Sequence, residues 1–244
     1  DGDQPAVVED TKGTKYWYKN GLKHRDGDKP AMIRSDGLKM WYKNGELHRE
    51  DDKPAIIYPN GTKKWCQNGK YHRVGDQPAV EMFDGTKEWY KNGELHREDD
   101  KPAVEDSNGS KLWYKNGLKH RDGDKPAMIR SDGLQMWYKN GEVHRDEDLP
   151  AVVSRDQFIW FQNGKENRNN GLPTLVHIDG TKKRKKDGEL YREGDLPAIE
   201  YSDGTQFWYK NGKLHREGDL PAIIYSNGKK EWYKNGELHR EGDQ

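Results

Sequence analysis

The histidines are the residues of this chain whose type and spacing could do chemistry, because imidazole binds metals and exchanges protons near neutral pH. A metal needs several ligands converging at about 2 Å, whereas equivalent residues of stacked hairpin repeats lie roughly 9 to 10 Å apart. The spacing therefore predicts packed imidazoles, and we expect no metal and no cofactor. Eight histidines follow a spacing of about 24 residues or multiples of it: His24, His48, His72, His96, His120, His144, His215 and His239. His177 does not follow this spacing.

No other group of residues indicates an enzyme. Nucleophile motifs, glycine-rich phosphate loops and isolated acid pairs do not stand out from the repeated pattern. The single cysteine, Cys66, stands where most repeats have Tyr after Trp, so we interpret it as a packing residue. We expect a non-catalytic protein in an intracellular or virion setting rather than a disulfide-rich secreted one.

The element that positions these residues is the stretch from Trp41 to Arg49, Trp-Tyr-Lys-Asn-Gly-Glu-Leu-His-Arg. Asn-Gly favours a two-residue type I′ turn, because both residues tolerate positive φ. The stretch therefore predicts a hairpin that pairs Lys43 with Glu46, Tyr42 with Leu47 and Trp41 with His48. Near copies begin at each of the eight remaining tryptophans of the chain: Trp17, Trp65, Trp89, Trp113, Trp137, Trp160, Trp208 and Trp232.

Prolines mark where the repeats begin. Ten units of about 24 residues fill residues 1–244 as a single repeat array, which leaves no room for a separate catalytic domain. The units open at Pro5, Pro30, Pro54, Pro78, Pro102, Pro126, Pro150, Pro173, Pro197 and Pro221. The chain begins and ends at the same point of the repeat, so we expect a segment of a longer array or ends that can abut another copy.

Each unit carries a second predicted hairpin. Pro54 opens a strand, and Asn60-Gly61 turns it back, so that a two-residue loop would pair Ile56 with Trp65. The residue two after each unit proline is apolar, which predicts a buried face of Trp, this aliphatic residue and His, and an opposite face of Ala, Tyr and Leu.

These patterns together predict an all-β fold: an elongated single-layer antiparallel meander of about ten stacked 24-residue hairpin repeats, an open β-repeat or solenoid-like ribbon. A lone hairpin is barely stable in water, so the units must stack. The nine tryptophans form the expected structural ladder, together with the residues His48, His96, His144, Arg49, Arg97 and Arg145.

Two charges recur with the tryptophan. An Arg follows the His position in every unit, and an Asp stands two residues before the unit proline everywhere except before Pro173. We interpret them as a structural pair, in which the guanidinium reaches the loop Asp or free carbonyls. The alternative is a row of anion-binding sites.

One unit, residues 167–192, is irregular. Asn167 replaces His, Thr174 replaces Ala and Arg184 replaces Trp. This irregular unit holds the one basic cluster of the sequence, a candidate partner-binding patch that could equally be a solvated sheet edge: Lys182, Lys183, Arg184, Lys185 and Lys186.

The motif Trp89-Tyr-Lys-Asn-Gly-Glu-Leu-His96 with the preceding Asp84-Gly85-Thr86-Lys87 resembles the membrane occupation and recognition nexus (MORN) repeat, over the whole chain. Arg and Pro-Ala stand where that family usually has Gly, so the chain is similar to the divergent repeat arrays of large DNA viruses of amoebae, phages and bacteria. The resemblance implies stacked hairpins that serve as scaffold, spacer or dimerisation module, without catalytic residues.

The net charge of zero limits the kinds of partner that the chain is expected to bind. Lys plus Arg and Asp plus Glu both number 43, so we expect no nucleic-acid binding, and membrane lipid is disfavoured. The predicted function is an extended structural or interaction scaffold, self-associating or virion-associated, with protein partners that include itself end to end. The alternative is an aromatic-ladder module that binds choline or glycan, in the manner of an adhesin.

Overall fold

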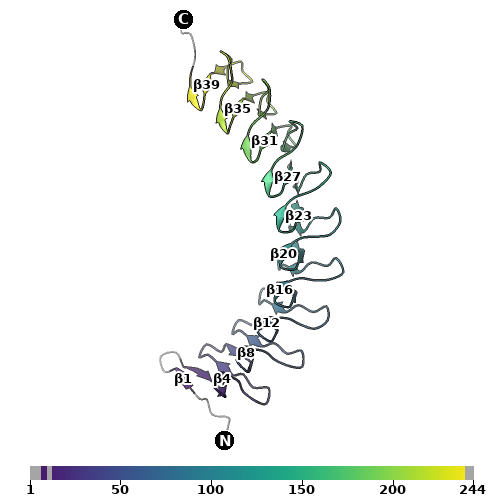
Figure 1. Ribbon diagram of the computed structural model, residues 1–244, viewed down its shortest axis with the longest axis vertical. Coiled ribbons are helices and arrows are strands. Elements are labelled where there is room, and N and C mark those ends of the chain that lie inside the picture. The colour runs from purple at the N-terminus through teal and green to yellow at the C-terminus, as the bar shows by residue number, and fades with distance from the viewer. Residues whose placement is uncertain (1–6, 10–12, 240–244) are drawn as a thin grey trace. The chain divides into compact units, whose positions relative to one another are not determined.

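The computed structural model describes residues 7–9 and 13–239, and no helix occurs among them. Chain contacts group the protein into two units, Asp1–Lys119 and His120–Gln244. Each unit is an antiparallel meander of repeated hairpins (Figure 1), which confirms the all-β repeat fold predicted from the sequence. The unit predicted to open at Pro5 lies partly outside the described residues, and the Arg240 position of the last repeat also lies outside them.

In the first unit, the described residues form a sheet of ten strands, each paired with the next along the chain. Its strands are β1 (Val7–Glu9), β2 (Thr14–Tyr16), β5 (Met32–Ile33), β6 (Lys39–Met40), β9 (Ile56–Ile57), β10 (Lys63–Lys64), β13 (Val80–Glu81), β14 (Lys87–Glu88), β17 (Val104–Glu105) and β18 (Lys111–Leu112). Separate two-stranded hairpins alternate with these strands: β3 (Tyr18–Lys19) with β4 (Leu22–Lys23), β7 (Tyr42–Lys43) with β8 (Glu46–Leu47), β11 (Cys66–Gln67) with β12 (Lys70–Tyr71), β15 (Tyr90–Lys91) with β16 (Glu94–Leu95), and β19 (Tyr114–Lys115) with β20 (Leu118–Lys119).

The second unit repeats this plan. Its sheet strands are β21 (Met128–Ile129), β22 (Gln135–Met136), β25 (Val152–Val153), β26 (Gln157–Ile159), β29 (Leu175–His177), β30 (Lys182–Lys183), β33 (Ile199–Glu200), β34 (Gln206–Phe207), β37 (Ile223–Ile224) and β38 (Lys230–Glu231). Its small hairpins are β23 (Tyr138–Lys139) with β24 (Glu142–Val143), β27 (Phe161–Gln162) with β28 (Lys165–Glu166), β31 (Lys185–Lys186) with β32 (Glu189–Leu190), β35 (Tyr209–Lys210) with β36 (Lys213–Leu214), and β39 (Tyr233–Lys234) with β40 (Glu237–Leu238).

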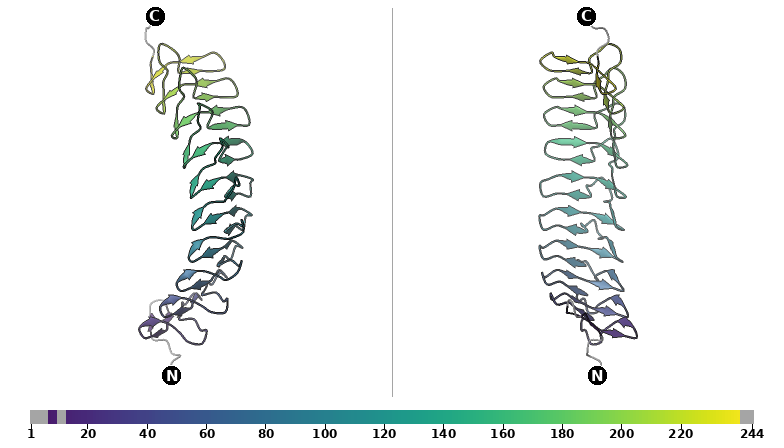
Figure 2. Two further views of the ribbon diagram at one scale, coloured as in Figure 1. Left: turned by 45° about the vertical axis from the view of Figure 1, so that its right-hand side comes forward. Right: turned by 90° about the vertical axis from the view of Figure 1, so that its left-hand side faces the viewer.

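A complete repeat thus has four short strands where the sequence indicated two longer ones. The Trp position separates a sheet strand from a small-hairpin strand, as Trp41 does between β6 and β7. The backbone N–H of Trp41 donates to the carbonyl of Ala55 in the next repeat, 2.8 Å away. Within each unit the small hairpins therefore form a row of their own beside the sheet (Figure 2), rather than the continuation of a single layer.

The Asn-Gly turn has the predicted register. Asn44 and Gly45 have φ of 51° and 86°, and β7 pairs with β8 through Tyr42 to Leu47 and Lys43 to Glu46. The backbone N–H of His48 donates to the Trp41 carbonyl at 3.1 Å, which completes the predicted pairing.

The register predicted for the second hairpin is wrong. Ile56 pairs with Lys64 and not with Trp65. The loop is one residue longer than a two-residue turn, because Tyr58 N–H donates to the Thr62 carbonyl and Gly61 closes the turn at a φ of 93°. A type I turn followed by a residue with positive φ gives this three-residue loop, and one added residue moves the pairing by one position.

The core differs from the predicted faces in one respect. Alanine, predicted on the less covered face, is fully buried in every described repeat that carries it: Ala31, Ala55, Ala79, Ala103, Ala127, Ala151, Ala198 and Ala222. Ile56 and Val80 are also buried, which agrees with the prediction that the residue two after the unit proline lies on the buried face. Ala lies just before the strand, in the connection that the preceding Trp contacts, so strand alternation does not decide its burial.

Candidate functional site

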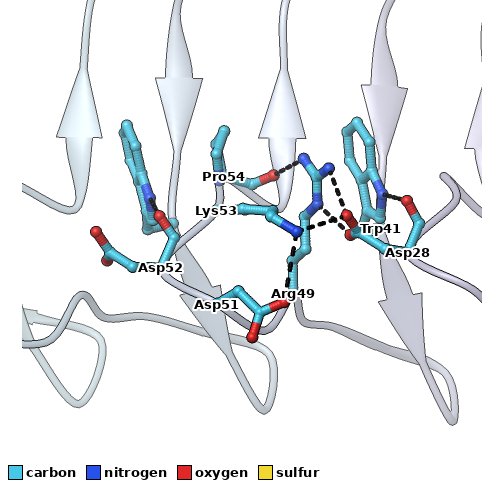
Figure 3. A network of polar contacts seen from close by, with 8 residues as sticks. Asp28, Trp41, Arg49, Asp51, Asp52, Lys53 and Pro54 are labelled. Atoms are coloured by element: carbon cyan, nitrogen blue, oxygen red, sulfur yellow. Dashed lines mark hydrogen bonds and ion pairs between the residues drawn. The ribbon is translucent and has the colours of Figure 1, made fainter.

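The most regular polar arrangement is the junction between successive repeats, built around Arg49 (Figure 3). Its Nε and Nη2 donate to the two carboxylate oxygens of Asp28 in the preceding repeat, at 2.7 and 3.2 Å. Its Nη1 donates to the carbonyl of Pro54, which opens the following repeat, at 3.1 Å. Lys53 Nζ adds a third donor to Asp28 at 2.9 Å.

The tryptophan of the repeat joins the same junction. The Trp41 indole N–H donates to the backbone carbonyl of Asp28 at 3.2 Å, and the Arg49 guanidinium carbon lies 3.8 Å from the ring centroid. Trp41 is 7% exposed, so its ring is almost wholly enclosed. Asp28 thus binds Arg49 through its side chain and Trp41 through its main chain.

The same two-pronged pair recurs in three described repeats of each unit. The first unit has Arg49 with Asp28, Arg73 with Asp52 and Arg97 with Asp76; the second has Arg145 with Asp124, Arg168 with Asp148 and Arg216 with Asp195. The sequence indicated an Arg paired with the Asp of its own loop or with free carbonyls. The carbonyl contact is present, but the Asp is that of the preceding repeat, so this part of the prediction was wrong.

The junction keeps its carboxylates ionised. Hydrogen bonds from Arg49, and then from Lys53, lower the pKa of Asp28 to about 2. Arg97 and Lys101 do the same to Asp76, whose pKa is also about 2. These are charge-assisted bonds to a partly exposed carboxylate, a geometry that favours its charged form.

The recurring histidines lie at a second contact between repeats. His48 Nδ1 accepts the backbone N–H of Asn68, in the turn of the next small hairpin, at 3.2 Å. On its other side, Nε2 of His48 lies 3.0 Å from the Glu50 carboxylate. Equivalent Nδ1 bonds join His24 to Asn44, His96 to Asn116, His120 to Asn140, His144 to Asn163 and His215 to Asn235.

No group of three His, Cys, Asp or Glu side chains within the described ranges could hold a metal ion. His177, off the 24-residue spacing, lies 3.6 Å from Asp156 and 3.0 Å from Asp179. Cys66 is a buried free thiol in an apolar cluster with Leu38, Ala55 and Ile56, and burial raises its pKa to about 11.

A contact that the sequence analysis missed joins the β-turns of neighbouring repeats. The hydroxyl of buried Thr62 accepts the backbone N–H of Phe83 at 3.1 Å, and Thr86 accepts that of Ser107 at 3.2 Å. The recurring Thr or Ser after Asn-Gly or Asp-Gly was the available signal.

The irregular unit, residues 167–192, does not have the Trp of the regular repeat junction, and it contains the basic cluster. Its five basic residues do not form one surface: Lys182 and Lys186 are exposed, whereas Arg184 is 7% exposed and occupies the Trp position. Lys185 pairs with Glu166 at 2.7 Å and Lys186 with Glu193 at 3.5 Å. Only part of the candidate partner-binding patch is therefore available as free positive charge.

Shallow hollows lie at repeat junctions of both units. One of about 430 Å³ in the first unit is lined by residues from His72 to Asp99. In the second unit, one of about 360 Å³ lies between His120 and Leu149, and one of about 630 Å³ lies at the irregular unit.

In comparisons with known proteins, no family model and no curated protein sequence matches the chain. Within the described residues, no helix is long and apolar enough to cross a membrane.

Proposed function

We propose that this chain is a non-catalytic repeat scaffold that spaces or joins protein partners, including further copies of itself. The observation that carries the proposal is the repeat junction. Its charged groups, exemplified by Arg49 and Asp28, bind one another across successive repeats instead of converging on a substrate. An active site requires a constellation that differs from its surroundings, whereas these groups recur with the same partners.

A duplicated block in the sequence supports the same function. Residues 17–49 and 113–145 differ only at Lys39 against Gln135 and Leu47 against Val143. They lie 96 residues apart, which is four repeats. Because each repeat brings both halves of a junction, repeats can be added or removed in phase without new contacts having to evolve. Variable length suits a spacer.

The enclosed tryptophans favour a scaffold over a choline- or glycan-binding ladder. A quaternary ammonium needs an accessible aromatic face. Trp41 and Trp65 are 7% and 6% exposed, and Arg49 and Arg73 lie over their rings at 3.8 and 3.9 Å. The chain's own cation occupies the place that the ligand would take.

An in-phase deletion tests the scaffold. Removing residues 66–89 joins Trp65 to Tyr90 and takes out 24 residues, one repeat. We expect a folded protein with a cooperative thermal transition close to that of the parent, measured by circular dichroism and calorimetry. The matched control removes only residues 66–77, which breaks the phase and should abolish folding of the first unit. If both deletions unfold it equally, the repeats are not interchangeable and the proposal fails.

A further inference from the structure

The irregular unit has an arginine whose usual partner is missing. Arg192 occupies the position of Arg49 and donates through Nη1 to the Pro197 carbonyl at 3.3 Å, as Arg49 does to Pro54. Two residues before Pro173, however, the chain has Gly171 instead of Asp. The carboxylate that fills the Nε and Nη2 fork elsewhere is therefore absent.

The backbone around Gly171 nevertheless keeps the shape of an Asp-bearing loop. Gly171 has a φ of 64°, and Asp148, one repeat earlier, has a φ of 54°. Leu172 N–H donates to the Asn169 carbonyl at 3.3 Å, the distance at which Leu149 N–H donates to the Asp146 carbonyl. A Cβ at Gly171 would meet no heavy atom within 4 Å. The space of the missing side chain is therefore open.

The site carries uncompensated positive charge. Arg184 and Arg192 share the carboxylate of Glu200, at 2.8 and 3.1 Å, so two guanidinium groups are paired with one acid. Arg184 is buried, and its Nε has no hydrogen-bond partner. In a regular junction a single guanidinium pairs with two acids: Arg73 forms ion pairs with Asp52 and with Glu81, at 3.0 Å each. The irregular junction thus lacks one negative charge and leaves a buried donor unsatisfied, which costs free energy.

These residues line one hollow. The hollow of about 630 Å³ includes Gly171, Arg184 and Arg192 in its wall. It is larger than the 430 Å³ hollow of the regular junction that contains Trp89 and Arg97. Its own acid Glu193 does not replace the missing one, because it pairs with Lys186, and the carboxylate that contacts Arg192 is that of Glu200, on Nη1.

We propose that this hollow is a carboxylate-binding site that receives an Asp or Glu side chain of a protein partner. The two nitrogens of the Arg192 fork match two carboxylate oxygens, as Arg168 matches Asp148 with both contacts at 2.8 Å. This inference deepens the proposed scaffold function by naming the chemistry of one partner, and it rests on that function for the partner being a protein.

The test titrates the whole chain with a short peptide blocked at both ends, acetyl-Gly-Asp-Gly-amide, and follows the Arg Nε–H signals by NMR. We expect saturable binding with a Kd in the millimolar range, which corresponds to one charge-assisted bidentate contact. The matching Asn peptide should not bind. Gly171→Asp should abolish binding by filling the fork from within, and Arg192→Lys should weaken it at least tenfold.

A second readout does not depend on the peptide. Gly171→Asp should raise the thermal midpoint of the second unit, whereas Gly171→Asn, which adds a similar side chain without charge, should not. Equal midpoints for the Asp and Asn variants, or no peptide binding at tens of millimolar, would overturn the site. Inorganic phosphate binding more tightly than the Asp peptide would overturn its assignment to carboxylates. None of these results affects the in-phase deletion, so the site and the scaffold can fail separately.

Discussion

Arg49 reaches back across a repeat boundary to Asp28, 21 residues earlier, with its Nε 2.7 Å from the carboxylate. The same guanidinium lies over the Trp41 ring and donates forward to the Pro54 carbonyl. One side chain therefore joins three successive repeats. Since it is enclosed by the contacts that it makes, it should contribute more to stability than an exposed ion pair does.

Replacing Arg49 tests this directly. Arg49→Ala should lower the free energy of unfolding by about 1 to 3 kcal/mol, because it removes the contact with the Trp41 ring, the pair with Asp28 and the part-buried hydrogen bond to Pro54 together. The matched control is Arg34→Ala, which removes a pair with Asp36 that is exposed and local. It should cost clearly less than Arg49→Ala, because an exposed local pair contributes little to stability. Urea unfolding followed by Trp fluorescence measures both, and equal costs would contradict the role given to Arg49.

Acid should weaken the junction. The pKa of Asp28 is about 2 in the folded chain against an ordinary value of 3.8. A lowered pKa contributes stability that is complete above the unfolded value and is lost as pH falls through the folded one. We therefore expect the urea midpoint to fall between about pH 4 and pH 2, and Asp28→Asn to reduce this dependence. The control is Asp99→Asn, which removes an exposed loop carboxylate 4.0 Å from Lys101 and leaves the pair of Asp28 with Arg49 in place.

Choline should have no effect on the thermal midpoint at tens of millimolar. Its cation would need an open indole face, and the face of Trp89 is covered by Arg97 at 3.6 Å. Differential scanning fluorimetry with choline and with sodium chloride at equal ionic strength separates binding from screening. A saturable rise of several degrees with choline alone would favour the ligand-binding alternative.

The thiol of Cys66 should report on opening of the first unit. It is 2% exposed, and burial raises its pKa to about 11, so little thiolate is available. We expect a disulfide reagent at pH 8 to modify the native chain orders of magnitude more slowly than the urea-unfolded chain. Equal rates would mean that the cluster around Ile56 opens freely.

The sequence predicted the register of the Asn44-Gly45 hairpin correctly, but not that of the second hairpin or the partner of each Arg between repeats. Asn44-Gly45 determined the turn and hence the pairing of Tyr42 with Leu47, because local φ preferences act over a few residues. The pairing of Ile56 failed, because Asn60-Gly61 also fits a three-residue loop and the glycine alone does not distinguish the two. Periodicity likewise showed that Arg and Asp recur together, but the same 24-residue spacing is compatible with an Asp of either adjacent loop.

The irregular unit yields the last prediction, a rebuilt junction. Arg184→Trp combined with Gly171→Asp would place an indole beneath Arg192 and a carboxylate on its fork, with Glu200 retained. This reproduces the arrangement of Trp65, Arg73, Asp52 and Glu81, in which the guanidinium lies 3.9 Å from the ring and pairs with both acids. Both changes act on the same guanidinium, so their effects should not be additive. In a double-mutant cycle measured by urea unfolding, we expect the gain in the free energy of unfolding of the double variant to exceed the sum of the two single gains by about 0.5 to 2 kcal/mol. A coupling energy of zero would show that Arg192 does not bridge the two positions.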